Sequence, residues 1–209
     1  MANKPNSNVH SKSITVAFLG PDGSGKSTII EGLQKQNLLL KRSDYFHLKP
    51  FVAPENAKAN VVDDPHAKKE YGFLKSTIKL LVFIIQYNVG WQLNIRKLKS
   101  KSSLIIFDRY FDDLLVDHRR YRYGGSKKLA KFIRNFIPRP DLYFILTAEP
   151  NIIHSRKKEV PLAELKRQVS VYRELGKGKR YFNIEVDRIP DEIVNEIVEI
   201  ITKKINEGN

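Results

Sequence analysis

Nine residues near the N-terminus have the types and the spacing of a phosphate-binding loop. The segment Gly20-Pro-Asp-Gly-Ser-Gly-Lys-Ser-Thr28 fits the pattern of a glycine, four residues and then Gly-Lys-Ser. Glycines let the backbone turn tightly and direct its N–H groups at an anion, and the start of a following helix adds positive potential. Lys26 can reach the β- and γ-phosphates, and the hydroxyl of Ser27 can bind a Mg²⁺ ion that bridges them. The nucleotide-binding residues predicted in this way are Gly20, Asp22, Gly23, Ser24, Gly25, Lys26, Ser27 and Thr28.

The neighbouring residues supply the structural context that this motif requires. The apolar, β-rich segment 14–19 precedes it, and the helix-compatible segment 29–36 follows it. A turn rich in Gly and Ser that only happens to precede a helix is the alternative, and the strand, loop and helix order argues against it. The sequence therefore predicts binding of a nucleoside triphosphate.

A second carboxylate stands where such a site needs one. The apolar segment 104–107 leads directly into Asp108 and Arg109. Ligands of open α/β sheets bind at the carboxyl ends of strands, where we expect Asp108 to hold the magnesium ion directly or through water. Arg109 would then point at a phosphate.

The rest of the chain supplies the elements that must position these residues. Apolar runs alternate with helical stretches at residues 13–19, 44–48, 103–108, 141–147 and 181–187. This alternation predicts an α/β fold, a P-loop three-layer sandwich with a five-stranded parallel sheet flanked by helices. Residues 70–99 are apolar almost all round and predict a long buried central helix, kinked near Gly90, with a helical register at Leu74, Ile78, Leu81, Ile85, Val89 and Leu93. Residues 190–206 predict a closing amphipathic helix, and the proline-containing segment 49–69 predicts a loop that shapes a site.

Composition limits the class of protein. The chain has 209 residues, 41% hydrophobic and 29% charged, which suits one domain over residues 13–209 after a disordered leader over residues 1–12. It has no cysteine, which is compatible with the cytoplasm, and no apolar run long enough to cross a bilayer. The formal charge of +14 attracts phosphate-bearing partners, but the basic residues are scattered and form no nucleic-acid-binding motif. We therefore expect a small-molecule partner rather than nucleic acid.

Three segments together resemble the thymidylate kinase family, part of the P-loop nucleoside monophosphate kinases. They are Phe18-Leu-Gly-Pro-Asp-Gly-Ser-Gly-Lys-Ser-Thr28, Ile106-Phe-Asp-Arg-Tyr110, and Pro140-Asp-Leu-Tyr-Phe-Ile-Leu-Thr-Ala148 leading to Arg156. The resemblance implies that Asp22 lies near the acceptor's sugar and that Arg109 binds the acceptor's phosphate. It also implies a mobile lid at about residues 150–165, whose Arg156 clamps the transferring phosphoryl group. ATP, Mg²⁺ and a homodimer are implied in the same way, although the sequence has no patch from which to derive a dimer.

The acceptor half departs from the family pattern. Phe83 matches the aromatic residue on which the acceptor base stacks, but Gln86 and Tyr87 stand where the family has the Asp-Arg pair that helps to recognise thymine. The family's Arg-Glu-Pro-Gly-Gly-Thr segment is replaced by His47-Leu-Lys-Pro50. The segment Asp117-His-Arg-Arg-Tyr-Arg-Tyr-Gly-Gly125 could grip an anionic or sugar-bearing acceptor or could equally be a solvated surface loop.

We expect an ATP-dependent kinase that phosphorylates a nucleoside monophosphate, thymidylate first. The expected catalytic residues are Lys26, Asp108, Arg109 and Arg156, the metal ligands are Ser27 and Asp108, and the acceptor residues are Asp22, Phe83, Gln86, Tyr87 and Arg109. A kinase of a nucleoside, sugar or glycoconjugate is the alternative; its hydroxyl acceptor would need a general base, with Asp22 or Asp108 nearest. A non-catalytic P-loop module that binds nucleotide or nucleic acid is a third hypothesis.

Overall fold

The computed structural model describes residues 12–36, 38, 40–51 and 69–207. In chain order the elements are β1 (Ile14–Leu19), α1 (Lys26–Lys35), β2 (Arg42–His47), α2 (Phe73–Gly90), the π-helical turn η1 (Trp91–Ile95), α3 (Arg96–Lys99), β3 (Ser103–Asp108), α4 (Phe111–Val116), α5 (Lys127–Ile133), the 3₁₀ turn η2 (Arg134–Phe136), β4 (Leu142–Thr147), α6 (Pro150–Arg156), α7 (Leu162–Leu175), β5 (Tyr181–Glu185) and α8 (Pro190–Glu207). Of the expected leader, only Lys12 is described, and its ammonium donates to the carbonyl of Ile205. Most of the expected loop over residues 49–69 lies outside the described residues.

The five strands form one parallel sheet in the order β2-β3-β1-β4-β5, which confirms the predicted fold class. Val16 lies at the centre, in register with Ile106 of β3 and Leu142 of β4. The chain leaves β1 toward β2 on one side and later places β4 on the other side. The loop after β1 therefore lies at a topological switch point, where open α/β sheets bind their ligands.

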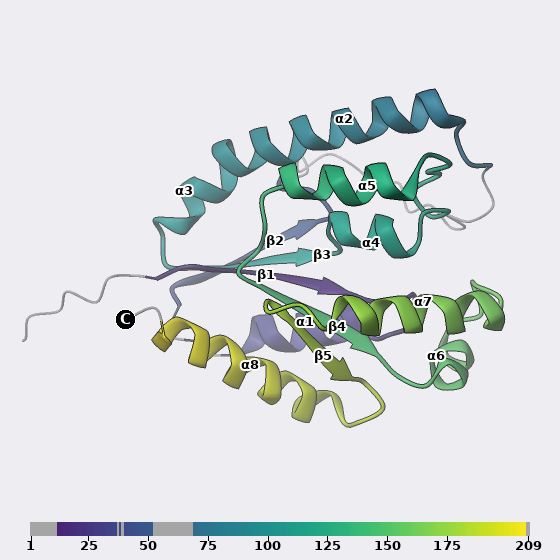
Figure 1. The fold of residues 1–209 in the computed structure, drawn as a ribbon. Helices are drawn as coiled ribbons and strands as arrows, with labels where there is room; N and C mark the ends of the chain where they lie inside the picture. The colour runs from purple at the N-terminus through teal and green to yellow at the C-terminus, as the bar shows by residue number, and fades with distance from the viewer. Residues whose placement is uncertain (1–11, 37, 39, 52–68, 208–209) are drawn as a thin grey trace, which may run out of the picture.

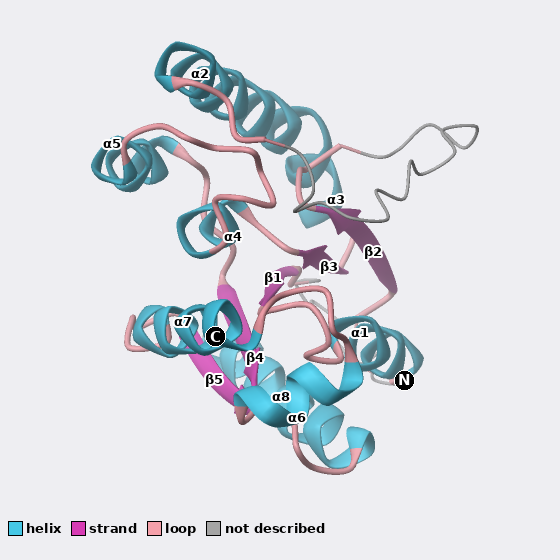
Figure 2. Cartoon of the chain, turned by 90° about the vertical axis from the view of Figure 1, so that its right-hand side faces the viewer, coloured by secondary structure: helices cyan, strands magenta, loops and turns pink. Residues whose placement is uncertain are grey.

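Helices cover both faces of the sheet (Figures 1 and 2). The helices α1 and α8 lie on one face, and α2, α4, α5 and α7 lie on the other. This arrangement follows from right-handed crossovers, because a connection that moves in the opposite direction along the sheet must pass over the opposite face.

Alternate side chains of β1 supply the two halves of the core. Val16 and Phe18 pack with α1 and α8, whereas Ala17 and Leu19 pack with α2 and α4. A strand that is buried on both faces reads as a continuous apolar run, which is why β1 was recognisable in the sequence.

The central helix forms as predicted, but its burial differs from the prediction. The π-helical turn begins directly after Gly90, where a Cβ atom would lie 2.6 Å from the carbonyl oxygen of Pro50. The face of α2 that packs on the core carries Leu80, Phe83 and Tyr87. The register expected to be buried is exposed, with relative exposures of 71% for Leu74, 51% for Ile78, 53% for Leu81, 62% for Ile85, 43% for Val89 and 52% for Leu93.

The closing helix confirms its prediction, because Ile193, Ile197 and Ile201 of α8 are all buried. Among the described residues, no helix combines the length and the apolar character that crossing a bilayer requires.

Candidate active site

The loop between β1 and α1 needs glycine at three positions. Gly20, Gly23 and Gly25 have φ angles of 145°, 84° and 78°, which residues with a side chain rarely adopt. A Cβ atom on Gly20 would lie 2.4 Å from the carbonyl oxygen of Leu146, and one on Gly23 would lie 3.0 Å from the Cβ of Lys157. The glycines therefore let the loop pass close to β4 and to the end of α6, with the first turn of α1 directly behind it.

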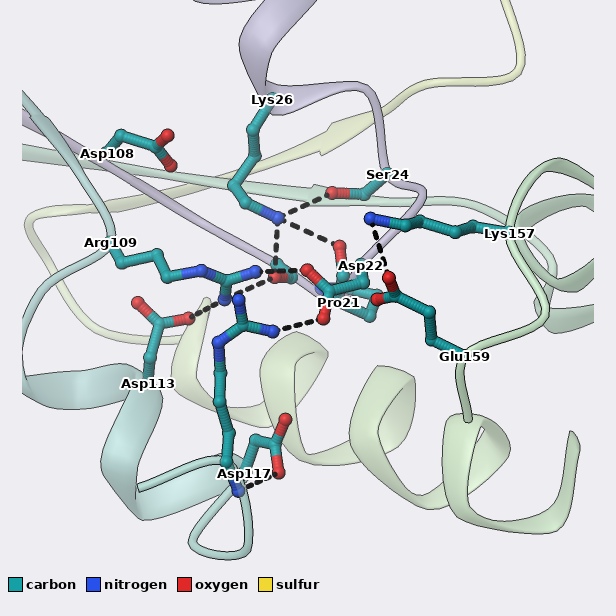
Figure 3. A network of polar contacts seen from close by, with 12 residues as sticks. Pro21, Asp22, Ser24, Lys26, Asp108, Arg109, Asp113, Asp117, Lys157 and Glu159 are labelled. Atoms are coloured by element: carbon teal, nitrogen blue, oxygen red, sulfur yellow. Dashed lines mark hydrogen bonds and ion pairs between the residues drawn. The ribbon is translucent and has the colours of Figure 1, made fainter. Parts of the chain in front are cut away.

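Lys26, the first residue of α1, directly follows this loop and is 7% exposed. Its ammonium donates to the carbonyl oxygens of Gly20 and Pro21, both at 2.8 Å, and to the hydroxyl of Ser24 at 3.3 Å (Figure 3). Burial, followed by the charge of Arg109, lowers the pKa of Lys26 to about 7. Phosphate oxygens carry the negative charge that these neutral partners lack, so a bound nucleotide would favour the ammonium form.

A cavity of about 480 Å³ opens at the carboxyl ends of β1 and β3. Its lining brings together the predicted residues Asp22, Gly23, Gly25, Lys26, Ser27, Thr28, Asp108, Arg109 and Arg156. It also includes His47, Arg120 and Lys157, of which His47 and Arg120 were not predicted as individual site residues.

Asp108 ends β3 and faces two residues of the neighbouring strand β2. The hydroxyl of Tyr45 donates to its Oδ2 at 3.0 Å, and Nδ1 of His47 lies 3.8 Å from the same oxygen. Burial alone would raise the pKa of Asp108, but the imidazole of His47 and the charge of Lys26 outweigh it and hold the pKa below its usual value. Asp108 is therefore a carboxylate at neutral pH.

The donor set at this point fits a magnesium ion. The Oδ1 atom of Asp108 is buried and has no hydrogen-bond partner among the described residues. Ser27, the second residue of α1, is exposed to the same cavity. No group of three or more His, Cys, Asp or Glu side chains that could hold a metal occurs in the described part of the chain. Mg²⁺ at phosphate-transfer sites needs only one or two protein ligands, because phosphates and waters complete its shell.

Arg109 reaches the loop through a strained backbone. Its φ angle is 69°, in the left-handed region, and its amide donates to the carbonyl oxygen of Phe18 at 3.0 Å. The Arg109 side chain is 6% exposed, and its guanidinium lies 2.5 Å from Oδ1 of Asp22 (Figure 3). On its other side it lies 3.5 Å from Oδ1 of Asp113. Such strain persists where the surrounding structure holds a functional group in place.

Asp22 is shared between two arginines. Its second carboxylate oxygen forms an ion pair with Arg120, from the loop between α4 and α5. Burial would raise the pKa of Asp22, but Arg109, Lys26 and Arg120 outweigh it and hold the pKa far below its usual range. Asp22 is therefore ionised and weakly basic.

Arg156 lies at the end of α6, and its guanidinium donates to the carbonyl of Val186 at 3.1 Å. Val186 directly follows β5, and Arg156 also lines the P-loop cavity. The next residue, Lys157, pairs with Glu159 at 2.9 Å (Figure 3).

The predicted acceptor residues on α2 divide into two groups. Phe83 is 4% exposed, and the ammonium of Lys49 lies 4.7 Å from its ring centroid while that of Lys79 lies 5.7 Å away. Tyr87 is fully buried, and its hydroxyl donates to the carbonyl of Leu48 at 2.6 Å. The structure thus places Tyr87 in the core, whereas Phe83 lies beneath two lysines.

Gln86 is half-buried between these two positions along the helix. Its Oε1 atom is buried and has no hydrogen-bond partner among the described residues. An unpartnered buried oxygen is costly unless something else satisfies it, and the assignment of Gln86 to the acceptor stays a prediction.

No protein-family model matches the chain. A probable thymidylate kinase from Pyrobaculum aerophilum is 26% identical over 203 residues, which cover 91% of this chain and 97% of that protein. The chain is a divergent relative of the thymidylate kinases.

Solved structures of thymidylate kinases share the fold of this thymidylate kinase relative. The enzyme from Candida albicans superposes with a TM-score of 0.65 at 19% identity and covers 93% of each chain. The enzyme from Ehrlichia chaffeensis has a TM-score of 0.58 at 18% identity, covering 91% of this chain and 99% of its own.

Two residues of the cavity, His47 and Arg120, were not predicted individually. Arg120 lies in the basic and aromatic segment 117–125, and that unusual composition was the available signal. A charged loop can face either a ligand or water, so its sequence alone could not assign a direction to each side chain.

Proposed function

We propose that this chain transfers the γ-phosphoryl group of ATP to a nucleoside monophosphate, with thymidylate as the acceptor: dTMP + ATP → dTDP + ADP. The observation that carries the proposal is Arg109, which the end of β3 brings into the P-loop cavity beside Asp22. The similarity to a probable thymidylate kinase over nearly the whole length of both chains supports the same acceptor. ATP is the donor in this reaction, and we propose the cytoplasm as its location.

Different groups would bind the phosphate donor and the phosphate acceptor. The amides of the P-loop and Lys26 would hold the donor phosphates, and Arg109 would hold the acceptor phosphate. Mg²⁺, held by Ser27 and Asp108, would neutralise charge on the β- and γ-oxygens. Transfer through a loose transition state asks mainly for alignment and neutralisation of charge, which these cationic groups can supply.

The helix α6 and the turn that follows it would form the lid. Arg156 and Lys157 line the P-loop cavity from this segment. We propose that its closure brings Arg156 from the carbonyl of Val186 to the transferring phosphoryl group.

The charge state of Asp22 favours a phosphate acceptor over a hydroxyl acceptor. An acceptor phosphate is already ionised, whereas a hydroxyl needs a general base whose pKa lies near the working pH. The pKa of Asp22 is held far below its usual range and that of Asp108 is also lowered. Both carboxylates are therefore poor bases.

One observation favours a second candidate, a kinase of a nucleoside, sugar or glycoconjugate. The ring of Phe83 is nearly buried under Lys49 and Lys79, and Tyr87 is part of the core. A base that stacks on Phe83 must displace these ammonium groups, whereas a sugar or glycoconjugate acceptor has no base and would not need that surface.

The test is ADP release by the purified protein with ATP and Mg²⁺ against a panel of acceptors. The panel contains thymidylate, uridylate, other nucleoside monophosphates, free nucleosides and common sugars. Turnover that is strongest with thymidylate would support the proposal, and turnover only with a nucleoside or sugar would replace it with the second candidate. Nucleotide binding without ADP release on any acceptor would favour a non-catalytic P-loop module.

We also propose a homodimer, supported by an exposed apolar face that runs along α2 and into η1. Seven side chains, 42% to 71% exposed, form this face: Leu74, Ile78, Leu81, Val82, Ile85, Val89 and Leu93. Soluble monomers rarely leave so continuous an apolar patch in water, and the family resemblance points to a second copy as its partner. Ile85→Glu should convert a dimer to a monomer in light scattering after gel filtration, while Ile189→Glu, at a 63% exposed isoleucine on another loop, should not. A wild-type protein that is monomeric at micromolar concentration would refute the dimer.

A further inference from the structure

The segment 117–125 sends its three arginines in different directions. Arg119 is exposed, and its side chain has no hydrogen bond or ion pair among the described residues. The guanidinium of Arg122 lies 4.1 Å from the ring centroid of Tyr71 and donates to the carbonyl of Lys69. Arg120 lines the P-loop cavity and forms an ion pair with Asp22. The segment is therefore neither wholly solvated nor wholly directed at a ligand, because Arg120 lines the cavity and Arg119 and Arg122 do not.

Contacts around Arg120 hold the segment in place. The amide of Arg120 donates to Oδ1 of Asp117 at 3.2 Å, and the ammonium of Lys79 on α2 donates to the carbonyl of Tyr121. The amide of Tyr71 donates to the carbonyl of Arg122 at 2.9 Å. The carbonyls of Tyr121 and Arg122 are thus anchored to Lys79 of α2 and to Tyr71 just before that helix, while the amide of Arg120 is held within the segment by Asp117. The approach of Arg120 to the P-loop is therefore built into the fold.

Two guanidinium groups converge on one carboxylate at this point. Arg109 takes one oxygen of Asp22 and Arg120 takes the other. Arg120 keeps 23% of its side chain exposed, whereas Arg109 keeps only 6%. Arg109 also has Asp113 at 3.5 Å, whereas Arg120 shares Asp22 with Arg109. A phosphate dianion in place of Asp22 would bring two negative charges and three oxygens that suit guanidinium forks.

A neighbouring donor also lacks a partner. Tyr121 is 7% exposed, and its hydroxyl is buried without a hydrogen-bond partner among the described residues. Tyr121 does not line the P-loop cavity, so its hydroxyl is not assigned to the phosphate site.

We propose that Arg120 is a second binding residue for the acceptor's phosphate, exchanging Asp22 for the phosphate oxygens when the acceptor binds. This inference rests on the proposed function, because it requires an acceptor that carries a phosphomonoester. In the bound state Arg109 and Arg120 would contact opposite sides of the same phosphate dianion. Before the acceptor binds, Asp22 pairs with both guanidinium groups.

The test compares Arg120→Ala, Arg120→Lys and the matched control Arg119→Ala in steady-state kinetics with dTMP. A charge-assisted hydrogen bond contributes about 1.5–3 kcal/mol. Arg120→Ala should therefore raise the KM for dTMP by about 10- to 100-fold, leaving the KM for ATP within about twofold of wild type. Arg120→Lys should recover part of this loss, and Arg119→Ala should match wild type. Equal effects of Arg120→Ala and Arg119→Ala on the KM for dTMP would overturn the inference, as would a loss confined to kcat.

A binding experiment separates this inference from the proposed function. The protein saturated with ADP and Mg²⁺ is titrated calorimetrically with dTMP and with thymidine, then with glucose 6-phosphate and with glucose. If wild type turns over no nucleotide but binds glucose 6-phosphate better than glucose, and Arg120→Ala abolishes that preference, the thymidylate acceptor is wrong and the inference stands. If wild type binds no phosphomonoester, or Arg120→Ala keeps the preference, the inference is wrong. Arg120→Gln, which retains the length of the side chain, replaces Arg120→Ala in both experiments if the alanine variant does not fold.

Discussion

The proposed donor half and the proposed acceptor half of this molecule are built in different ways. The donor half consists of backbone amides in a glycine loop, the start of α1 and a carboxylate at the end of β3. The acceptor half consists of side chains from α2 and from the loop between α4 and α5, with lysines over Phe83 and an arginine on Asp22. A site made by backbone geometry tolerates few changes, whereas a site made by side chains can be rewritten while the fold persists.

The largest expected effect is in the donor half. Lys26→Ala removes the charged group enclosed by the P-loop and should lower kcat by about 10²- to 10³-fold, as loss of one transition-state donor does. Stopped assays of ADP release measure it. Lys35→Ala, at the exposed end of the same helix, is the control, and a Lys26 variant with wild-type kcat would mean that the donor half is not where phosphoryl transfer occurs.

A smaller effect is expected at the lid. Arg156→Ala should reduce kcat/KM for ATP by about tenfold, because one charge-assisted contact to phosphate is lost. The measurement is initial rate against ATP concentration at saturating acceptor. Lys158→Ala, two residues along the same segment, should leave kcat/KM unchanged; equal losses in both variants would indicate a general effect of surface charge instead of a clamp.

Substitution of Asp22, which lies between the donor half and the acceptor half, tests whether the acceptor needs a general base. Asp22→Asn should change kcat with thymidylate by less than about fivefold, because an ionised phosphate needs no general base. A hydroxyl acceptor would instead lose about 10²-fold. Asp191→Asn, at the start of α8, controls for charge, and a 10²-fold loss with thymidylate would contradict the assignment of Asp22 as a weak base.

The smallest effect concerns pH in the acceptor half. Burial, followed by repulsion from Lys49 and Arg122, lowers the pKa of Lys79 to about 8. Raising the pH from about 7 to 9 therefore removes a positive charge near Phe83, and an anionic acceptor should bind less tightly. The KM for thymidylate should rise about two- to threefold over this range, as expected for a partly exposed charge.

Lys79→Met should abolish this pH dependence, and Lys75→Met, one turn earlier on α2, should retain it. The KM for ATP should rise over the same pH range by the same factor in all three proteins, because the pKa of Lys26 in the P-loop is lowered to about 7. A rise in the KM for thymidylate that persists in Lys79→Met would place the titrating group elsewhere than Lys79.

The core face of α2 illustrates the limit of sequence reasoning. Residues 70–99 are apolar on nearly every side, so their periodicity indicates a helix without indicating which side faces the sheet. The register of Leu74, Ile78 and Leu81 was expected to be buried, but the sheet lies against Leu80, Phe83 and Tyr87. A helix with two apolar faces is oriented by its neighbours, and its second face then remains for a partner.

The sequence alone determined the strands, the P-loop and the carboxylate at the end of β3, because each is a local pattern whose geometry follows from its own residues. Tertiary structure alone decided that Arg120 reaches Asp22, 98 positions away along the chain, while Arg119 faces water. It also decided that Tyr87 belongs to the core and that Lys49 and Lys79 cover Phe83. Side-chain direction in a loop depends on what packs around that loop, and contacts between distant segments have no local pattern in the sequence.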